Sequence, residues 1–216
     1  VVFLFVLPPL VGPEGRGRGL MIDVGLSVLL LAGVAAVSTH AAVRAVLFVL
    51  VVAALAPYKK VDVAIEACRR AGVRLVVVGD GPERARLEQA GGPSTRFAGR
   101  VGPAELRRLY STASCYLQTG IEDFGIATVE ALACGTPVLA LGEGGVLDIV
   151  EHGRHGLLVD EPGVETLAAA IDKIQRMQFN LMDLRSRAEE FSAERFTTRL
   201  KGYLRPFWPE SEGESS

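Results

Sequence analysis

From Val46 onward, short apolar runs alternate with segments of helical spacing, and short loops rich in glycine and proline separate them. The first run, residues 46–55 (VLFVLVVAAL), is continuously apolar, as expected for a strand buried on both faces. The next segment, residues 61–72, has apolar side chains at helical spacing and ends at Gly72, a residue that commonly terminates helices. Such alternation predicts a parallel sheet with helices on both faces.

The same pattern continues along most of the chain. It predicts further strands at residues 74–79, 95–99, 114–119, 136–141 and 156–159. It predicts further helices at residues 82–91, 103–113, 125–135 and 145–153, and then at 164–178, 181–191 and 193–207. We therefore expect an α/β, Rossmann-like domain over residues 46–207, followed by a polar, disordered tail at 208–216.

Residues 1–45 form an apolar segment without this alternation, and we expect no full domain there. Within it, residues 24–43 carry no Asp, Glu, Lys or Arg, and this length is just sufficient to span a bilayer. The glycine, serine, threonine and histidine in this stretch weaken the case for a membrane span. A membrane span and a buried helix therefore both stay open. No basic region precedes the first apolar run, which argues against a signal peptide.

Charge and composition exclude several classes of site. The 216 residues carry a formal net charge of −2, so no global basic field is present to bind nucleic acid. The cysteines and histidines lack metal-ligand spacing, and we expect no metal site, buried reduced cysteines and surface histidines in a cytoplasmic protein. If residues 24–43 insert, the protein would lie at the inner face of the membrane. The cysteines are Cys68, Cys115 and Cys134, and the histidines are His40, His152 and His155. The expected surface placement concerns His152 and His155.

Four loops follow predicted strands and meet at the carboxyl edge of the sheet, where open parallel sheets bind ligands. They comprise residues 56–60, 79–83, 119–125 and 141–145. The third loop enters a helix near Gly125, so the amides of Phe124, Gly125 and Ile126 lie at a helix start. Such amides, together with the helix dipole, bind phosphate or sugar oxygens. We therefore expect the ligand site at this loop.

Two carboxylates flank this helix start. Glu122 precedes the helix and Glu130 lies on it, eight positions later. A carboxylate beside the cleft can accept two hydrogen bonds from vicinal hydroxyls, which sugars and riboses offer. Equally, Glu130 could be a solvated helix residue and Glu122 an N-terminal capping charge. Spacing alone leaves both interpretations of the two glutamates open. Lys59 likewise could either bind a ligand or be an ordinary surface lysine surrounded by solvent.

The stretch EDFGIATVEALACGTP, residues 122–137, resembles the E-x7-E motif of retaining glycosyltransferases of family 4, which have the two-domain GT-B fold. Further matching motifs follow the family order, at residues 57–67, 75–88, 97–101 and 142–159. The resemblance covers residues 47–207, roughly the C-terminal donor-binding domain of a GT-B fold. It is nearest to bacterial enzymes that transfer mannose or a similar hexose in polysaccharide assembly.

The resemblance implies a role for each matching residue of the third loop and its helix. Glu130 would hold the ribose hydroxyls of the donor nucleotide, and Glu122 would face the donor hexose. The amides of Phe124, Gly125 and Ile126 would contact the sugar and the diphosphate. The implied reaction is hexose transfer, with mannose favoured, from a GDP- or UDP-sugar to a glycan or lipid-linked acceptor, with retention at the anomeric carbon.

The resemblance also assigns residues of two other loops. Lys59 would neutralise the diphosphate and stabilise the leaving group, while the backbone of Arg100 and Val101 would flank the base pocket. No cofactor or metal ion is implied. Family members usually carry a second cation five residues before the lysine, where this chain has Ala54. One of two cations is therefore missing, and we expect weaker donor binding or leaving-group stabilisation.

A second departure concerns the acceptor half. A GT-B enzyme has an N-terminal domain of comparable size, which residues 1–45 do not match. A missing N-terminal domain or a partner chain would then supply that half. Three hypotheses follow: a glycosyltransferase, a nucleotide-sugar-binding module or truncated fragment without turnover, and a membrane-anchored partner protein.

Overall fold

The computed structural model describes residues 47–161 and 163–205, all within one compact unit, Arg44–Ser216. The expectations for residues 1–45, including the membrane span at 24–43, lie outside the described residues, as does the expected tail at 208–216. No helix in the described part of the chain is long and apolar enough to cross a membrane.

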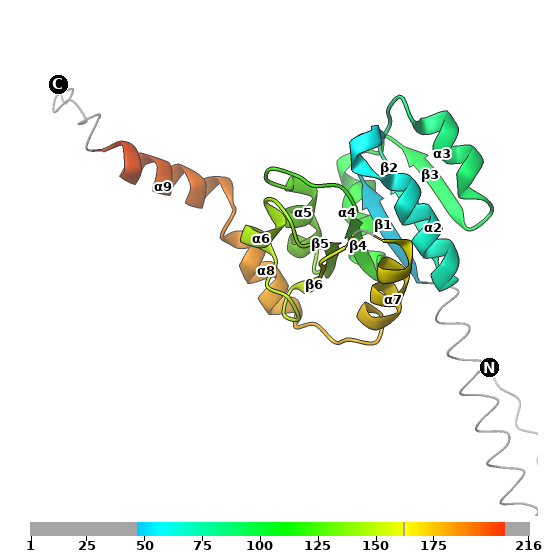
Figure 1. Ribbon diagram of the computed structural model, residues 1–216. Helices are drawn as coiled ribbons and strands as arrows, with labels where there is room; N and C mark the ends of the chain where they lie inside the picture. Colours follow the sequence, from blue (N-terminus) through cyan, green and yellow to red (C-terminus); the bar gives the residue numbers. More distant parts are fainter. Residues whose placement is uncertain (1–46, 162, 206–216) are drawn as a thin grey trace, which may run out of the picture. The chain divides into compact units, whose positions relative to one another are not determined.

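Six parallel strands form a single sheet in the order β3-β2-β1-β4-β5-β6 (Figure 1). Their bounds are β1 Phe48–Val52, β2 Arg74–Val78, β3 Thr95–Gly99, β4 Cys115–Gln118, β5 Val138–Leu141 and β6 Gly156–Val159. All five neighbouring pairs are parallel. The chain builds outward from β1 to β3, returns to β4 on the other side of β1, and then continues to β6. This reversal makes the β1–β4 boundary the switch point where α/β sheets bind ligands.

Helices cover both faces of the sheet, as the alternation predicts. Their bounds are α2 Val61–Ala71, α3 Arg84–Gly91, α4 Pro103–Thr112, α5 Ile126–Ala133, α6 Val146–Ile149, α7 Val164–Ile174, α8 Leu181–Glu189 and α9 Ala193–Leu204, with a 3₁₀ turn, η1, at Pro57–Lys59. Successive strand residues point to opposite faces. Val49 and Val51 of β1 therefore join the core beneath α2 and α7, whereas Leu50 joins the core beneath α4, α5 and α8.

The observed elements confirm the predicted fold, with changes at some bounds. The first strand is shorter than predicted, ending at Val52 rather than at residue 55. Ala53 still donates its amide to the carbonyl of Val78 at 3.0 Å, but the backbone then turns, and Leu55 donates to the carbonyl of Asp80 at 3.0 Å. The turn η1 follows at once and was not predicted from the sequence.

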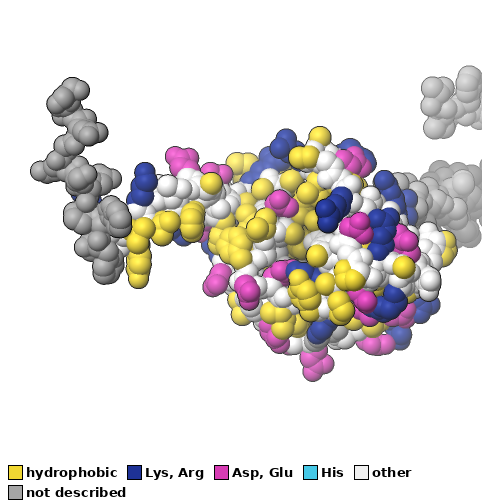
Figure 2. Space-filling model, turned by 90° about the horizontal axis from the view of Figure 1, so that it is seen from above, with side chains coloured by type: hydrophobic (Ala, Val, Ile, Leu, Met, Phe, Trp, Pro, Cys, Tyr) yellow, Lys and Arg dark blue, Asp and Glu magenta, His cyan; other side chains and the backbone are white. Residues whose placement is uncertain are grey.

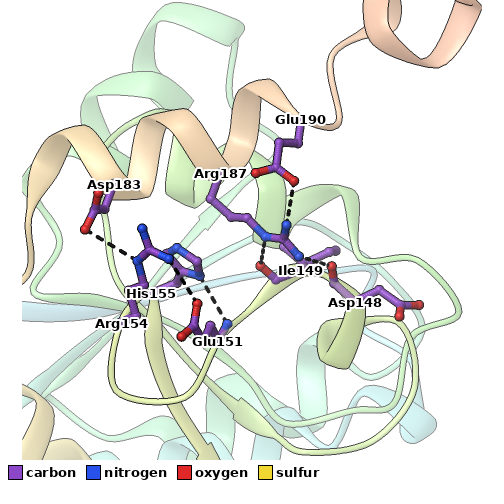
Figure 3. Close-up of polar contacts among 8 residues, drawn as sticks. All are labelled: Asp148, Ile149, Glu151, Arg154, His155, Asp183, Arg187 and Glu190. Carbon is purple, nitrogen blue, oxygen red and sulfur yellow. Dashed lines mark hydrogen bonds and ion pairs between the residues drawn. The ribbon is translucent and has the colours of Figure 1, made fainter. Parts of the chain in front are cut away.

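The surface placement predicted for His155 is wrong. Its side chain is only 4% exposed, and its Nδ1 accepts the backbone N–H of Glu151 at 3.1 Å (Figure 3). Burial lowers the pKa of the imidazole, and the nearby Arg154 and Arg187 lower it further. His152 is exposed, as predicted. The sequence offered no cue to this difference, because both residues sit in the same glycine-punctuated connection.

Two of the three cysteines, Cys68 and Cys115, are buried, as predicted, and Cys134 is half-buried.

The last helix, α9, differs from the others in the exposure of its side chains. α9 buries none of its side chains, and Phe196, Leu200, Tyr203 and Leu204 are exposed along it. Figure 2 shows hydrophobic side chains gathered along one side of α9 and charged ones on another. α9 is therefore an amphipathic helix with an exposed apolar face.

Candidate functional site

The loops after β1 and β2 are joined by backbone contacts that only glycine permits. Glu83 donates its amide to the carbonyl of Leu55 at 3.0 Å. A Cβ atom on Gly81 would lie 2.5 Å from the same carbonyl oxygen, closer than any side chain could approach. The GDGPE loop predicted at this edge is thus packed directly on the loop that leads into η1.

The loop after β4 interlocks with both of its neighbours. The hydroxyl of Thr119 donates to the carbonyl of Lys59 at 2.7 Å, and a Cβ atom on Gly120 would lie 2.7 Å from the carbonyl oxygen of Tyr58. On the other side, the amide of Gly145 donates to the carbonyl of Glu122 at 2.8 Å. The loops at residues 56–60, 119–125 and 141–145 therefore contact one another through their backbones at the switch point.

Lys59 and Glu122 form an ion pair across the switch point, from Lys59 Nζ to Glu122 Oε1. The side chains are 11% and 29% exposed, so water screens the pair only partly. The ammonium group of Lys59 also lies 4.9 Å from the centre of the Tyr58 ring. These two contacts hold Lys59 in place. Lys59 is therefore not a lysine surrounded by solvent alone. Likewise, Glu122 pairs with this lysine rather than capping the helix.

Helix α5 begins shortly after Glu122 in the chain. Its N-cap is Gly125, with φ of 93°, a left-handed conformation that favours glycine. No side chain caps the helix, and its first turn carries no acidic residue. Phe124 and Ile126 are exposed on either side of the buried Gly125. An uncapped helix start next to a lysine is suited to bind an anion through its amides.

A buried polar group that the sequence analysis did not single out supports this helix start. The hydroxyl of Thr128, in the first turn of α5, donates to Oε1 of Gln118 at the end of β4, at 2.7 Å. Gln118 is only 4% exposed, and among the described residues its Nε2 has no hydrogen-bond partner. The amide group lies against Gly125, since a Cβ atom there would be 3.5 Å from Gln118 Oε1. Gln118 therefore ties α5 to the sheet directly under the site.

Glu130 lies one turn further along α5 and is exposed. The hydroxyl of Tyr110, which is buried on α4, donates to Glu130 Oε2 at 3.0 Å. Burial raises the pKa of Tyr110, with smaller contributions from Tyr116 and Glu130, so the phenol stays protonated and remains a donor. Tyr110 orients a carboxylate that otherwise faces solvent. The sequence carried no signal for this pairing, because Tyr110 fits the helix pattern as an ordinary core residue.

Arg100 and Val101 follow β3 at the same carboxyl edge, with β2 between their strand and β1. The structure therefore brings together Lys59, Glu122 and the start of α5, and places Arg100 and Val101 farther along the edge. Ala54 is exposed in the loop that leads to Lys59. Within residues 47–161 and 163–205, no three His, Cys, Asp or Glu side chains converge as a metal site would require.

Comparison with known proteins assigns this arrangement to a family. The family described as Glycosyl transferases group 1 matches residues 41–195, more than half of the chain. The chain belongs to this family. The six-stranded parallel sheet with helices on both faces is the Rossmann-like half of a GT-B fold.

The curated relatives carry several names, among them GDP-mannose-dependent alpha-mannosyltransferase and D-inositol 3-phosphate glycosyltransferase. The chain is 36% identical over 122 residues to a GDP-mannose-dependent alpha-mannosyltransferase of Corynebacterium glutamicum, covering 56% of this chain and 29% of that protein. It is 41% identical over 106 residues to a protein of the same name from Mycobacterium tuberculosis, covering 49% of this chain and 28% of that protein. The chain thus matches less than a third of the length of either relative.

Among solved structures, the chain resembles that of the Anabaena protein Alr3699/HepE in complex with UDP, with a TM-score of 0.62 and 25% identity. The match covers 78% of this chain and 51% of that one. A glycosyltransferase of avilamycin A biosynthesis, AviGT4, shares the fold at 22% identity and a TM-score of 0.63, over 77% of this chain and 53% of that one. About half of each solved chain has no counterpart in the matched region.

Proposed function

We propose that this chain is the donor-binding half of a retaining family 4 glycosyltransferase that transfers a hexose, with mannose favoured, from a GDP- or UDP-sugar. The observation that carries the proposal is the pairing of Lys59 with Glu122, a residue of the loop that leads into the uncapped start of α5. This arrangement offers a cation and helix amides for a diphosphate, next to a carboxylate for sugar hydroxyls. Membership of the group 1 family and the names of the mannosyltransferase relatives support it.

In this proposal, the donor diphosphate lies between the ammonium group of Lys59 and the amides of Phe124, Gly125 and Ile126. When the bond from the anomeric carbon to the diphosphate oxygen breaks, the electron pair leaves with the diphosphate. Donors that are already in place stabilise the charge that develops there. The acceptor hydroxyl oxygen then bonds to the anomeric carbon on the same face, which gives retention, and its proton passes to the departing diphosphate oxygen. No metal ion or cofactor takes part.

Binding of the donor rearranges the ion pair. In the free protein, Glu122 neutralises Lys59. A diphosphate that takes over the lysine releases the Glu122 carboxylate, which can then accept hydrogen bonds from the hexose hydroxyls. Glu130, oriented by Tyr110, would bind the ribose hydroxyls, and the backbone of Arg100 and Val101 would flank the base. The sugar and nucleotide would therefore be bound by separate carboxylates.

The acceptor half belongs to the proposal too. A glycan or lipid-linked acceptor would bind to an N-terminal domain or a partner chain that closes over the carboxyl edge. The enzyme would work in the cytoplasm, at the inner face of the membrane if residues 24–43 associate with the bilayer.

Ala54 favours a second candidate function, a nucleotide-sugar-binding module without turnover. It stands exposed in the loop before Lys59, at the position where the resemblance expects a second cation. A charge-assisted hydrogen bond is typically worth about 1.5–3 kcal/mol, so losing one lowers leaving-group stabilisation substantially. This module would hold the donor and leave transfer to another protein.

Calorimetric titration with GDP, UDP, GDP-mannose and UDP-glucose, followed by a donor-hydrolysis assay, separates these functions. Binding with slow release of free sugar supports the transferase, whereas binding without turnover supports the module. An absence of binding to all four compounds would eliminate both. Glu130→Ala should weaken nucleotide binding, whereas Lys201→Ala, an exposed change on α9, should not. Equal effects of the two substitutions would mean that the ribose site lies elsewhere.

A further inference from the structure

Arg187, on α8, makes an unusual set of contacts with the end of another helix (Figure 3). Its Nε donates to the carbonyl of Ile149 at 2.9 Å, and its Nη2 donates to the carbonyl of Asp148. Its Nη1 donates to Glu190 Oε2 at 2.6 Å, so the guanidinium charge is neutralised by the C-cap residue of its own helix. One side chain thus binds two backbone oxygens at the end of α6.

Those two carbonyls belong to the last turn of α6, where backbone oxygens lack partners within the helix. A cation at a helix C-terminus also interacts favourably with the helix dipole. α6 has only four residues, so its position depends on contacts made outside the helix. Arg187 is 25% exposed, which keeps its hydrogen bonds partly shielded from water. Arg187 is therefore a principal anchor of this short helix.

The start of α6 leads directly to the candidate site. The residue before the helix is Gly145, whose amide donates to the carbonyl of Glu122 at 2.8 Å. Gly144 pairs with Glu122 in an isolated parallel bridge. Any shift of α6 is transmitted to the backbone of Glu122 through these contacts.

A second path leads from the same arginine to the other end of the loop. The guanidinium group of Arg187 lies 5.1 Å from the centre of the Phe191 ring. Phe191 in turn packs edge-on against Phe124, with ring centres 5.9 Å apart. Arg187 is therefore linked to the loop that carries Glu122 by two indirect paths, one through α6 and one through the Phe191–Phe124 pair.

Glu130 is anchored differently. Its carboxylate accepts a hydrogen bond from Tyr110 on α4, and neither residue takes part in the contacts of Arg187. The two carboxylates assigned to the donor thus depend on different supports. A change at Arg187 should reach Glu122 and leave Glu130 in place.

We propose that Arg187 is a positioning residue that sets the hexose-binding part of the donor site, by holding α6 and the 119–125 loop in place, without contributing to the part that binds the ribose and base. This inference rests on the proposed function. In this inference, Arg187 affects binding of the sugar without touching it, through the position of Glu122.

The test compares Arg187→Lys with Arg154→Lys. A lysine at 187 keeps the charge but cannot reproduce the planar fork that reaches both carbonyls and Glu190. Arg154 is a matched control, because it also links to α8, through Asp183 at 3.5 Å, but binds only exposed carboxylates. Affinities for GDP and GDP-mannose, and for UDP and UDP-glucose, are measured by calorimetry on each full-length variant.

We expect Arg187→Lys to weaken binding of the nucleotide sugar by about fivefold to tenfold, the loss typical of one neutral hydrogen bond. The bare nucleotide should be weakened less, because among its groups only the diphosphate would lie at this loop. Arg154→Lys should change neither affinity. Equal weakening of sugar and nucleotide would show a merely structural role, and no weakening of either would show that α6 needs no such anchor. Either of these two results would overturn the inference.

Hydrogen exchange on the unliganded chain provides a readout independent of binding. The amide of Gly145 should exchange faster in Arg187→Lys than in Arg154→Lys, because its hydrogen bond to Glu122 depends on the position of α6. Unchanged exchange would overturn the inference even if binding differed. Failure of the unmutated chain to bind any nucleotide would instead overturn the proposed function, and the exchange experiment would still decide whether Arg187 holds the 141–145 loop.

Discussion

Gly145 allows a direct test of how tightly the site loops are packed. A Cβ atom at this position would lie 2.3 Å from the carbonyl oxygen of Asp123 and 2.7 Å from the Cα of Phe124. Gly145 has φ of −62°, which any residue adopts, so Gly145→Ala adds crowding without backbone strain. The groups it meets are backbone atoms, which cannot rotate away as a side chain end would.

The magnitude follows from the distances. Non-bonded carbon atoms attract each other at about 3.5–4.0 Å, so the two loops must separate by about 1 Å. Overpacking of this kind costs about 1–3 kcal/mol in the free energy of unfolding, which corresponds to a fall in Tm of about 2–12 °C for a chain of this size. Because Gly145 also donates to the carbonyl of Glu122, the same separation should weaken nucleotide-sugar binding.

Gly102→Ala is the matched control. Gly102 is also an N-cap, for α4, with φ of −73°, but no atom lies within 4 Å of the Cβ position. Thermal unfolding by circular dichroism should show a smaller change for Gly102→Ala than for Gly145→Ala, and titration should show unchanged ligand affinity for the control. Equal falls in Tm for the two variants would refute the argument, since the cost would then come from the N-cap and not from contact between the loops.

Three further predictions concern other parts of the structure. Ala54→Arg should strengthen diphosphate binding by about tenfold or more, as one added charge-assisted hydrogen bond implies, and Ala54→Gln should not; calorimetry with GDP or UDP would expose an error if the two behaved alike. The pKa of His155 is lowered on folding, so its contribution to stability is complete above the ordinary value near 6.5 and is lost as pH falls through the lower folded-state value. His155→Asn should flatten the loss of Tm below pH 6.5, whereas His152→Asn should leave it unchanged. Burial raises the pKa of Cys115 to about 12, so iodoacetamide should label the half-buried Cys134 first in the native protein, and rapid native labelling of Cys115 would contradict its burial.

Local pattern was sufficient to predict most of the fold. The strands at residues 95–99 and 156–159 have the predicted bounds, because apolar periodicity and glycine stops reflect the immediate surroundings of each residue. The end of β1 was placed three residues too late. Ala53 to Leu55 remain apolar after the chain leaves the ladder, so composition could not mark that boundary.

The candidate site could be predicted only in its local part. The helix start at Gly125 follows from adjacent residues, and the structure confirms it. The partners that position it come from far along the chain: Lys59 pairs with Glu122, and Tyr110 with Glu130. Such pairings depend on the order of strands in the sheet, and periodicity carries no information about that order. The burial of His155 was missed for the same reason, since it depends on elements packed against it.

The switch point has a consequence for cooperativity. Lys59 follows β1, whose half of the sheet also holds β2 and β3, whereas Glu122 and α5 belong to the half that holds β4, β5 and β6. Within the sheet, the halves meet only along the β1–β4 ladder, where the paired positions are Val49 with Cys115 and Leu50 with Tyr116. Under the proposed function, a diphosphate bound by Lys59 and by the amides of α5 would act as a non-covalent crosslink across this short seam. Donor binding would then replace one contact across this seam, the Lys59–Glu122 ion pair, with another that joins both halves through the diphosphate.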